Sequence, residues 1–129
     1  MKTITTPIAE ISFDEVESVL HVKVLEDADM NLKNAKIHYE KINKLLGSKK
    51  YFALVDASNY FTMEQDAWKY ASSKEVISNR MAVAHYNASF ANKLTTNFFK
   101  SMYQTAIPLQ IFDSKEEAEK WLKSMKATS

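Results

Sequence analysis

The sequence predicts an α/β domain: a single mixed, mostly parallel sheet of about five strands with helices packed on it, in the order β-β-α-β-α-β-α-β-α. Segments whose apolar residues recur at every second position alternate with segments that have the helical period. Strands joined through helices form right-handed crossovers, which pair strands in parallel. The one glycine and two prolines of the 129 residues fall between these segments. One domain over residues 1–129, with an ordered core at about 8–125, is expected.

The first two strands are expected at residues 8–13 and 18–25. In the second, Leu20, Val22 and Val24 alternate with polar residues, which is typical of a strand with one buried face. The gap between the strands is too short for a helix. They are therefore predicted to form an antiparallel hairpin, with the first strand at an edge of the sheet.

A helix is predicted over residues 30–46, followed by a strand over 51–56. Asp29 or Asn31 can cap the start of this helix. Gly47 is placed to end it in the left-handed conformation that helices favour at this point. The strand is almost continuously apolar, as expected for a central strand that is covered on both faces.

The second half of the chain supplies the remaining three helices and two strands. Thr62 and Gln65 have capping-box spacing and predict the start of a short helix. Ser114 and Glu117 repeat this spacing and predict the start of the last helix. The elements expected between them are a strand at 81–86, a helix at 89–104 and a strand at 109–112.

The predicted helix at 89–104 carries an apolar stripe: Phe90, Leu94, Phe98 and Met102. The aromatics Phe98, Phe99 and Tyr103 continue along this helix, and an aromatic stripe is most often part of the core. Phe98 and its neighbour Phe99 point about 100° apart on a helix, however, so one of them reaches a second surface unless the helix is deeply buried. Phe99 and Tyr103 are therefore proposed for self-association, with a homodimer as the expected product.

Composition excludes several classes of protein. The 17 basic and 16 acidic residues are interspersed, so no nucleic-acid partner is expected. There are no cysteines, which excludes disulfides, thiolate catalysis and zinc–thiolate sites. No apolar run approaches the ~20 residues of a membrane-spanning helix, and the N-terminus lacks the apolar stretch of a signal peptide. A cytoplasmic protein is expected.

Three stretches resemble the SpoIIAA-like group of STAS-related domains, whose fold is also compared with the lipid-binding Sec14/CRAL-TRIO domain. The stretches are Leu54-Val55-Asp56-Ala57-Ser58, Asn97-Phe98-Phe99, and Ile111-Phe112-Asp113-Ser114 with Glu117-Ala118 and Trp121-Leu122. The resemblance covers about residues 8–125 and implies a STAS-like fold. In anti-sigma-factor antagonists of this group a phosphorylatable serine follows the corresponding strand, and Ser58 is the nearest match. Its neighbours differ, since Tyr60-Phe61 stand where the family has a Ser-Gly-Leu-Gly segment.

Ligands of open α/β sheets bind beyond the carboxyl ends of the strands. The residues expected at that edge, and assigned to ligand or partner binding, are Asp56, Ser58, Asn59, Tyr60, Phe61, Tyr86, Asn87 and Phe90. Asp56 can orient a ligand there, or it can cap the following loop through neighbouring amides. Asp113, at the end of the last strand, is expected to have the structural role.

No metal site and no cofactor are predicted. None of the three histidines has a second histidine at helical metal-ligand spacing. His21 and His38 are expected at the surface, whereas His85, late in a central strand, is expected in the interior or at its rim. One glycine cannot build a phosphate-binding loop.

Four functions are weighed on this basis. The first is a non-enzymatic protein-interaction or regulatory module of STAS type that binds a protein partner or itself. The alternative is a binding domain for a small apolar or lipid-like ligand at the carboxyl edge of the sheet. A third is a switch through phosphorylation of Ser58, where phosphate would add about two negative charges beside Asp56. Catalysis comes last, with Asp56 and His85 as its best pair.

Overall fold

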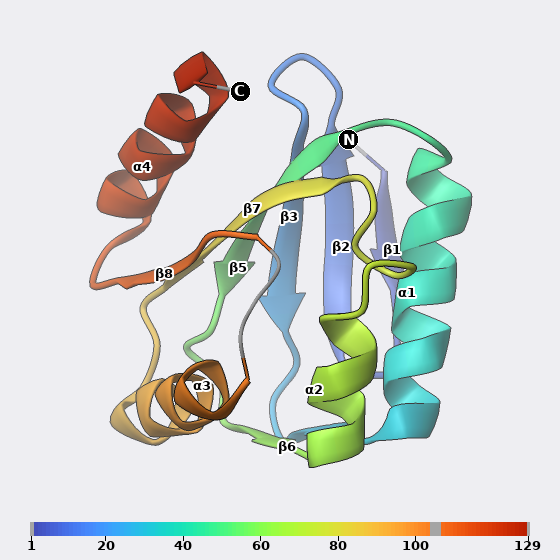
Figure 1. Cartoon of the computed structure of the whole chain (residues 1–129), viewed down its shortest axis with the longest axis vertical. Helices are drawn as coiled ribbons and strands as arrows, with labels where there is room; N and C mark the ends of the chain where they lie inside the picture. The colour runs from blue at the N-terminus through green and yellow to red at the C-terminus, as the bar shows by residue number, and fades with distance from the viewer. Residues whose placement is uncertain (1, 104–106, 129) are drawn as a thin grey trace.

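The computed structural model describes residues 2–103 and 107–128 (Figure 1). The eight strands of these residues are β1 (Thr3–Thr5), β2 (Ala9–Asp14), β3 (Val19–Val24), β4 (Ala28–Met30), β5 (Tyr51–Asp56), β6 (Phe61–Met63), β7 (Arg80–Tyr86) and β8 (Leu109–Phe112). The helices are α1 (Leu32–Leu46), α2 (Gln65–Ala71), α3 (Phe90–Met102) and α4 (Lys115–Thr128). Gln104, the last residue of the helix predicted at 89–104, lies outside the described residues.

Six strands form one mixed sheet in the order β1-β2-β3-β5-β7-β8, and β4 pairs with β6 in a small second sheet. β1–β2 and β2–β3 are antiparallel, whereas β3–β5, β5–β7 and β7–β8 are parallel. The predicted α/β class and the predicted hairpin are confirmed. The expected edge position of the first predicted strand is wrong, because β1 pairs beside β2 and makes a sixth strand. β1, β4 and β6 have three residues each, too few to show a period.

The helices cover the two faces of the sheet unequally. α1 and α2 lie over one face, α3 lies beside the carboxyl ends of the strands, and α4 lies on the opposite side (Figure 1). The second face buries only a small cluster, in which Phe52 and Leu54 of β5 pack with Ala118 and Leu122 of α4. β5 is therefore buried on both faces, as its continuous apolar sequence predicts.

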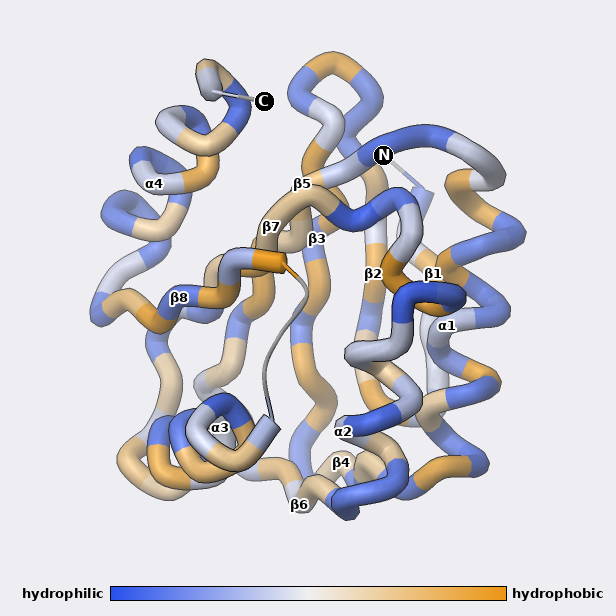
Figure 2. The backbone as a smooth tube through the Cα atoms, viewed as in Figure 1, coloured by the Kyte–Doolittle hydropathy of each residue, from blue (hydrophilic) through white to orange (hydrophobic). Residues whose placement is uncertain are grey.

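Strands far from α4 keep one solvated face. In β3, Leu20 is 1% exposed and faces the main core, whereas Lys23 is exposed on the other side. Figure 2 shows the same alternation of hydrophobic and hydrophilic residues along the neighbouring strands, and a mainly hydrophilic α4. Alternation of apolar and polar residues in the sequence thus indicates the strands whose second face α4 does not cover.

Helix ends follow the local sequence in most cases. Asn31, Ser89 and Ser114 each accept a hydrogen bond from the backbone N–H three residues further on, at 2.8–3.2 Å. Gly47 ends α1 with a positive φ of 60°, which favours glycine as expected, but its ψ of −125° differs from the left-handed helical conformation that the sequence predicts. None of the helices within the described residues is long and apolar enough to cross a membrane.

The predicted capping box at Thr62 is wrong. α2 begins after Glu64, whose side chain makes no capping hydrogen bond, and Thr62 belongs to β6. The Thr62 hydroxyl instead donates to Asp29 Oδ1 at 3.0 Å, across the β4–β6 pair. The Thr62 hydroxyl, which the local pattern assigned to a helix cap, therefore bonds to a strand residue that is distant in the sequence.

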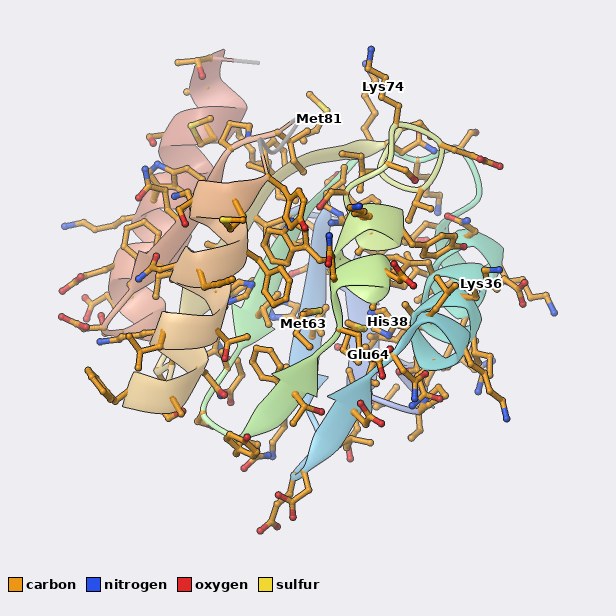
Figure 3. The ribbon with its side chains drawn as sticks, turned by 60° about the horizontal axis from the view of Figure 1, so that its bottom comes forward. Lys36, His38, Met63, Glu64, Lys74 and Met81 are labelled. Atoms are coloured by element: carbon orange, nitrogen blue, oxygen red, sulfur yellow. The ribbon has the colours of Figure 1, made fainter. Side chains whose placement is uncertain are left out.

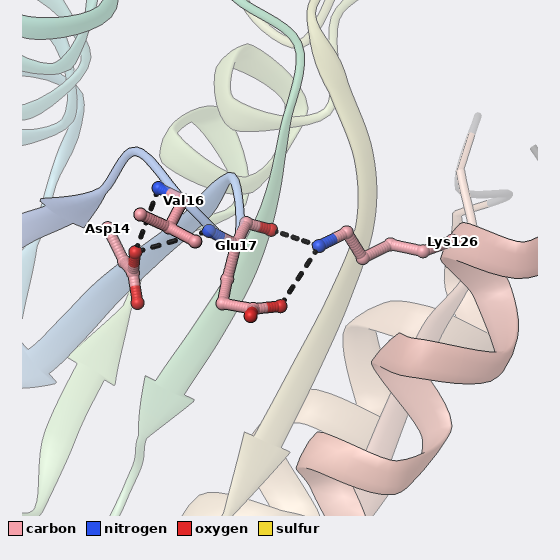
Figure 4. A network of polar contacts seen from close by, with 4 residues as sticks. All are labelled: Asp14, Val16, Glu17 and Lys126. Atoms are coloured by element: carbon pink, nitrogen blue, oxygen red, sulfur yellow. Dashed lines mark hydrogen bonds and ion pairs between the residues drawn. The ribbon is translucent and has the colours of Figure 1, made fainter.

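The β2–β3 turn is tied to the end of α4 (Figure 4). Asp14 Oδ1 accepts hydrogen bonds from the amides of Val16 (3.0 Å) and Glu17 (3.2 Å), which shapes the turn. Lys126 Nζ donates to the Glu17 carbonyl and lies 3.3 Å from Glu17 Oε2. This contact joins the hairpin to the helix on the second face of the sheet.

Candidate ligand-binding cavity

A cavity of about 150 Å³ lies between the main sheet and helices α1 and α2. Its floor consists of side chains of β2, β3, β5 and β7, such as Leu20, Ala53 and Val83. Phe61 and Met63 of β6 line it near the carboxyl ends of the strands, and Tyr51 and Arg80 line it at their amino ends. Figure 3, seen toward the β4–β6 pair, shows His38 and Met63 in the interior, whereas Lys36 and Lys74 project outward.

Small side chains make this space. Four alanines line the cavity: Ala9, Ala28, Ala53 and Ala71. Ala53 lies in the middle of β5 and is 5% exposed, a position that Leu or Val usually fills in a central strand. Because interiors pack densely, an alanine there leaves space that its neighbours do not close.

His38 is buried in the cavity wall, so its predicted surface position is wrong. It lies on the inner face of α1, 4% exposed, and its Nδ1 is 2.9 Å from the Thr6 hydroxyl. Burial, with a smaller effect of the Arg80 charge, lowers the pKa of His38 to about 3. The imidazole is therefore neutral near pH 7. One signal could have found this position: His38 stands next to Tyr39, which belongs to the apolar stripe of α1. The sequence does not show, however, which group a buried histidine would bond to.

Arg80 is the charged residue of the cavity wall. It opens β7 and is partly buried, with Nε donating to the Tyr51 hydroxyl at 3.3 Å. Its guanidinium carbon lies 5.0 Å from the centre of the Tyr39 ring, a cation–π distance. Both partners are neutral, and no ion pair of Arg80 with an acidic side chain occurs within residues 2–103 and 107–128.

Two buried polar atoms of cavity residues have no hydrogen-bond partner within the described part of the chain: Trp68 Nε1 and His85 Nδ1. His85 lies late in β7, partly buried, as the sequence predicts. Burial, followed by the charges of Arg80 and Lys100, lowers the pKa of His85 to about 4. Such orphan groups are rare in folded proteins and indicate a site for water or a ligand.

The predicted binding residues do not form one site. The Ser58 amide donates to Asp56 Oδ1 at 3.1 Å, the loop-capping geometry that was the alternative interpretation of Asp56. Ser58 itself is exposed. Asn59 Nδ2 donates to the Val24 carbonyl at 2.9 Å and thus fastens the loop to β3.

The aromatic residues predicted at this edge point in different directions. Phe61 is 7% exposed and lines the cavity, whereas Tyr86 packs with the cluster under α4. Tyr60 and Phe90 are 51% and 77% exposed. Asn87 is exposed and adopts φ 54°, which fits a turn residue. Of this set, only Phe61 belongs to the cavity.

The catalytic pair is not assembled. In the β5–β7 register His85 lies opposite Val55, and Asp56 lies opposite Tyr86. Since neighbouring residues of a strand point to opposite faces, His85 faces the cavity with Val55 and Asp56 faces the other side with Tyr86. The sheet therefore separates the two side chains. Asp113 follows β8 directly and forms an exposed ion pair with Lys93 at 3.0 Å.

The helix α3 turns its apolar stripe outward. Phe90, Leu94, Phe98 and Met102 are 49–77% exposed, so the core interpretation of the helix aromatics is wrong for Phe98. Phe99 and Tyr103 instead pack against the main core, with the Phe99 ring stacked 5.4 Å from Trp68. Their role in self-association stays a prediction. Of the adjacent residues Phe98 and Phe99, the one that faces solvent is Phe98.

Asn92 is the residue of this region whose structural importance sequence reasoning missed. It is fully buried on the inner face of α3. Its Nδ2 donates to the carbonyls of Ala57 and Asn59, both at 2.7 Å, and its Oδ1 accepts from the Phe61 amide at 3.4 Å. One side chain thereby fixes the loop that leads from β5 to Phe61 at the cavity. An Asn within an apolar helix has no local signal of this role.

In the described ranges, no group of three or more His, Asp or Glu side chains is placed to hold a metal ion. Comparison with known proteins gives one family. A family model described as a domain of unknown function, DUF7793, matches residues 13–126. Neither the curated proteins nor the solved structures give a match.

Proposed function

We propose that this chain, which belongs to the DUF7793 family, is a non-enzymatic domain that binds a small, largely apolar ligand in the cavity between the sheet and helices α1 and α2. The observation that carries the proposal is the cavity itself, mainly apolar and bordered by a few polar groups. This combination is typical of small-molecule sites. The proposed position is the sheet face, and Phe61 is the only residue of the predicted carboxyl-edge set that lines it.

The size of the cavity limits the ligand. A dry apolar cavity of about 150 Å³ holds one ring of roughly the size of benzene. At about 24 cal/mol per Å³, filling a space of this size is worth up to about 3–4 kcal/mol of stability. That is a large share of the ~5–15 kcal/mol that keeps a domain folded. A ligand that fills the space is therefore expected to stabilise the fold.

The resemblance to STAS-related domains supports a binding role rather than catalysis. The fold that the resemblance implies is compared with a lipid-binding domain, and it hosts regulatory modules that act by contact. The positions of Asp56 and His85 on opposite faces of the sheet support the same proposal. A ligand in the cavity and a regulatory role are compatible, because Phe61 lines the cavity and the loop before it carries the exposed Ser58.

The test is binding of toluene, a neutral apolar probe, followed by NMR spectroscopy of the methyl and amide groups. We expect shifts at cavity residues such as Ala53 and Val83, and none at Leu122 under α4. Ala53→Leu should fill the cavity and abolish the shifts. Ala91→Leu, the same change at an exposed position of α3, should leave them intact. Equal binding by wild type and Ala53→Leu would place the probe elsewhere and defeat the proposal.

A second function, self-association through α3, is favoured by one observation. Four large apolar side chains of this helix face solvent together: Phe90, Leu94, Phe98 and Met102. Patches of this kind mark interaction surfaces in many proteins. If a second copy of the chain covers this stripe, light scattering should give a dimer that dissociates in Phe98→Ser. A wild-type monomer at high concentration would remove this function.

Phosphorylation of Ser58 fits the same interaction role. The residue is exposed, and Asp56 already receives its amide hydrogen bond. A phosphate there would add about two negative charges beside the carboxylate, enough to break the loop cap or recruit a basic partner. Ser58→Glu should then change the mass of the complex in light scattering, whereas Ser48→Glu, also exposed, should not.

A further inference from the structure

We infer that the cavity ligand is a small monocarboxylic acid whose apolar body fills the cavity and whose carboxylate pairs with the guanidinium of Arg80. This inference rests on the proposed function and deepens it by naming the ligand class. It starts from the charge of the cavity wall, because the size and apolar lining alone would fit any neutral ring.

Within residues 2–103 and 107–128, no acidic side chain forms an ion pair with the guanidinium of Arg80. Arg stays protonated in proteins, and a cation withdrawn from water is usually paired with an anion. Here its neighbours are two tyrosines: the Tyr51 hydroxyl lies 3.3 Å from Nε, and Tyr39 offers its hydroxyl and its ring, whose centre lies 5.0 Å from the guanidinium carbon. The ion pairs found in the described ranges join lysines to surface carboxylates instead. A cation on an apolar cavity wall therefore selects for an anion from outside the chain.

The contacts that Arg80 does make hold it in place. The Tyr51 hydroxyl and the Tyr39 ring come from β5 and α1, so the guanidinium is fixed between the sheet and the helix. Arg presents several N–H donors in a planar fork that matches the two oxygens of a carboxylate. A fixed fork at the end of an apolar space is suited to a ligand with one acidic group at the end of an apolar body.

The other polar groups of the cavity add no negative charge. His38 is neutral and already bonded to Thr6. His85 is neutral at pH 7 because burial lowers its pKa, and its Nδ1 is one of the two orphan atoms. Trp68 Nε1, the other orphan, can only donate. The cavity thus offers two donors, the charged Arg80 and the neutral Trp68, and the unpaired Nδ1 of His85. These groups favour an anion that carries oxygen atoms and disfavour a cation.

The experiment compares four probes of similar size at pH 7: benzoate, benzamide, toluene and benzylammonium. Binding to the full chain is followed by NMR shifts of cavity residues. We expect benzoate to bind at least about tenfold more tightly than benzamide, the affinity that one charge-assisted hydrogen bond supplies. Benzylammonium should give no cavity shifts. This comparison uses wild-type protein alone, so it does not depend on a variant that folds.

Variants then assign the charge. Arg80→Gln should reduce benzoate affinity by at least about tenfold while toluene affinity changes by less than about twofold. Arg80→Lys, which keeps the charge, should retain part of the preference for benzoate. Lys49→Gln, a change at an exposed cation, should alter neither affinity.

The outcomes separate the two proposals. If toluene and benzamide shift the cavity residues and benzoate binds no better, the carboxylate inference is overturned and the apolar-ligand function stands. If none of the four probes shifts them, both are overturned, and about five ordered waters would account for the volume. If benzoate is preferred but Arg80→Gln weakens toluene equally, Arg80 acts only on the shape of the cavity, and the inference is overturned.

Discussion

Asn92 shows how one buried side chain can position a loop. Its amide group makes three hydrogen bonds to the segment 57–61, which carries Phe61 to the cavity. We predict that Asn92→Ala lowers the free energy of unfolding by about 2–4 kcal/mol, since it leaves two buried carbonyls and an amide without a partner. Urea unfolding measures this. Asn97→Ala, at an exposed position of the same helix, should change it by less than about 0.5 kcal/mol.

His38 gives the protein a titratable group that the fold keeps neutral. Its pKa is about 3 in the folded state and near 6.5 when exposed, so the unfolded chain binds more protons between these values. The stability that this residue supports is complete above about pH 6.5 and is lost as the pH falls toward 3.

We therefore predict that His38→Gln flattens the pH dependence of stability. Between about pH 6 and 4 the wild-type free energy of unfolding should fall more steeply, by up to about 1.4 kcal/mol per pH unit, than that of the variant. Urea unfolding at several pH values measures both slopes. The partly buried His21, whose pKa burial also lowers, should contribute less than the almost fully buried His38, so His21→Gln is the control. Parallel curves for wild type and His38→Gln would contradict the assignment.

Residues that act locally could be predicted from the sequence, and residues that act across the fold could not. Asn31 and Gly47 cap α1 through bonds to neighbours in the chain, and both were expected. Arg80 depends on Tyr39 and Tyr51, about 30–40 residues away in the chain, and on the cavity that they share. No period or spacing indicates such a partner, so the candidate site had to come from the structure.

At the scale of elements, α3 shows what a helical period leaves open. The outward stripe from Phe90 to Met102 and the inward set Asn92, Thr96, Phe99 and Tyr103 both recur at helical spacing. Apolar character favoured the first set as the core. The structure buries the second, because Asn92 and Thr96 lie against the loop and sheet while Phe99 stacks on Trp68. The period predicts that faces exist, and tertiary contacts decide which one is covered.

This orientation predicts opposite effects for two adjacent residues. Phe99→Ala should lower the free energy of unfolding by about 2–3 kcal/mol, because it removes the ring stacked between Trp68 and Tyr103. Phe98→Ala should cost less than about 1 kcal/mol, since this ring is 49% exposed. Thermal unfolding of both variants at low protein concentration checks the order. If Phe98→Ala proves the more damaging change, α3 is rotated relative to the arrangement described here.

At the scale of the whole molecule, the two faces of the sheet have different tasks. The face under α4 is closed by a compact cluster of large and small apolar side chains. The face under α1 and α2 holds the larger cluster and also the cavity, so stability and binding compete there for the same volume. The sequence predicted the sheet and its helices, but it did not predict the cavity. A cavity depends on the sizes of many side chains from several elements, so no single strand or helix indicates it.

The cavity predicts an unusual response to pressure. Unfolding eliminates internal voids, so its volume change is negative and scales with them, and 150 Å³ corresponds to about 90 mL/mol. Wild-type protein should therefore unfold at moderate pressure, with a volume change near the large end of the usual range. Ala53→Leu should reduce its magnitude, because the added methyl groups occupy the void, and Ala91→Leu at the surface should not. Pressure unfolding followed by tryptophan fluorescence measures the volume change of all three proteins.

Saturating toluene should reduce the volume change of the wild type as Ala53→Leu does, since either one fills the same space. An equal volume change in every case would mean that the space is already occupied by water.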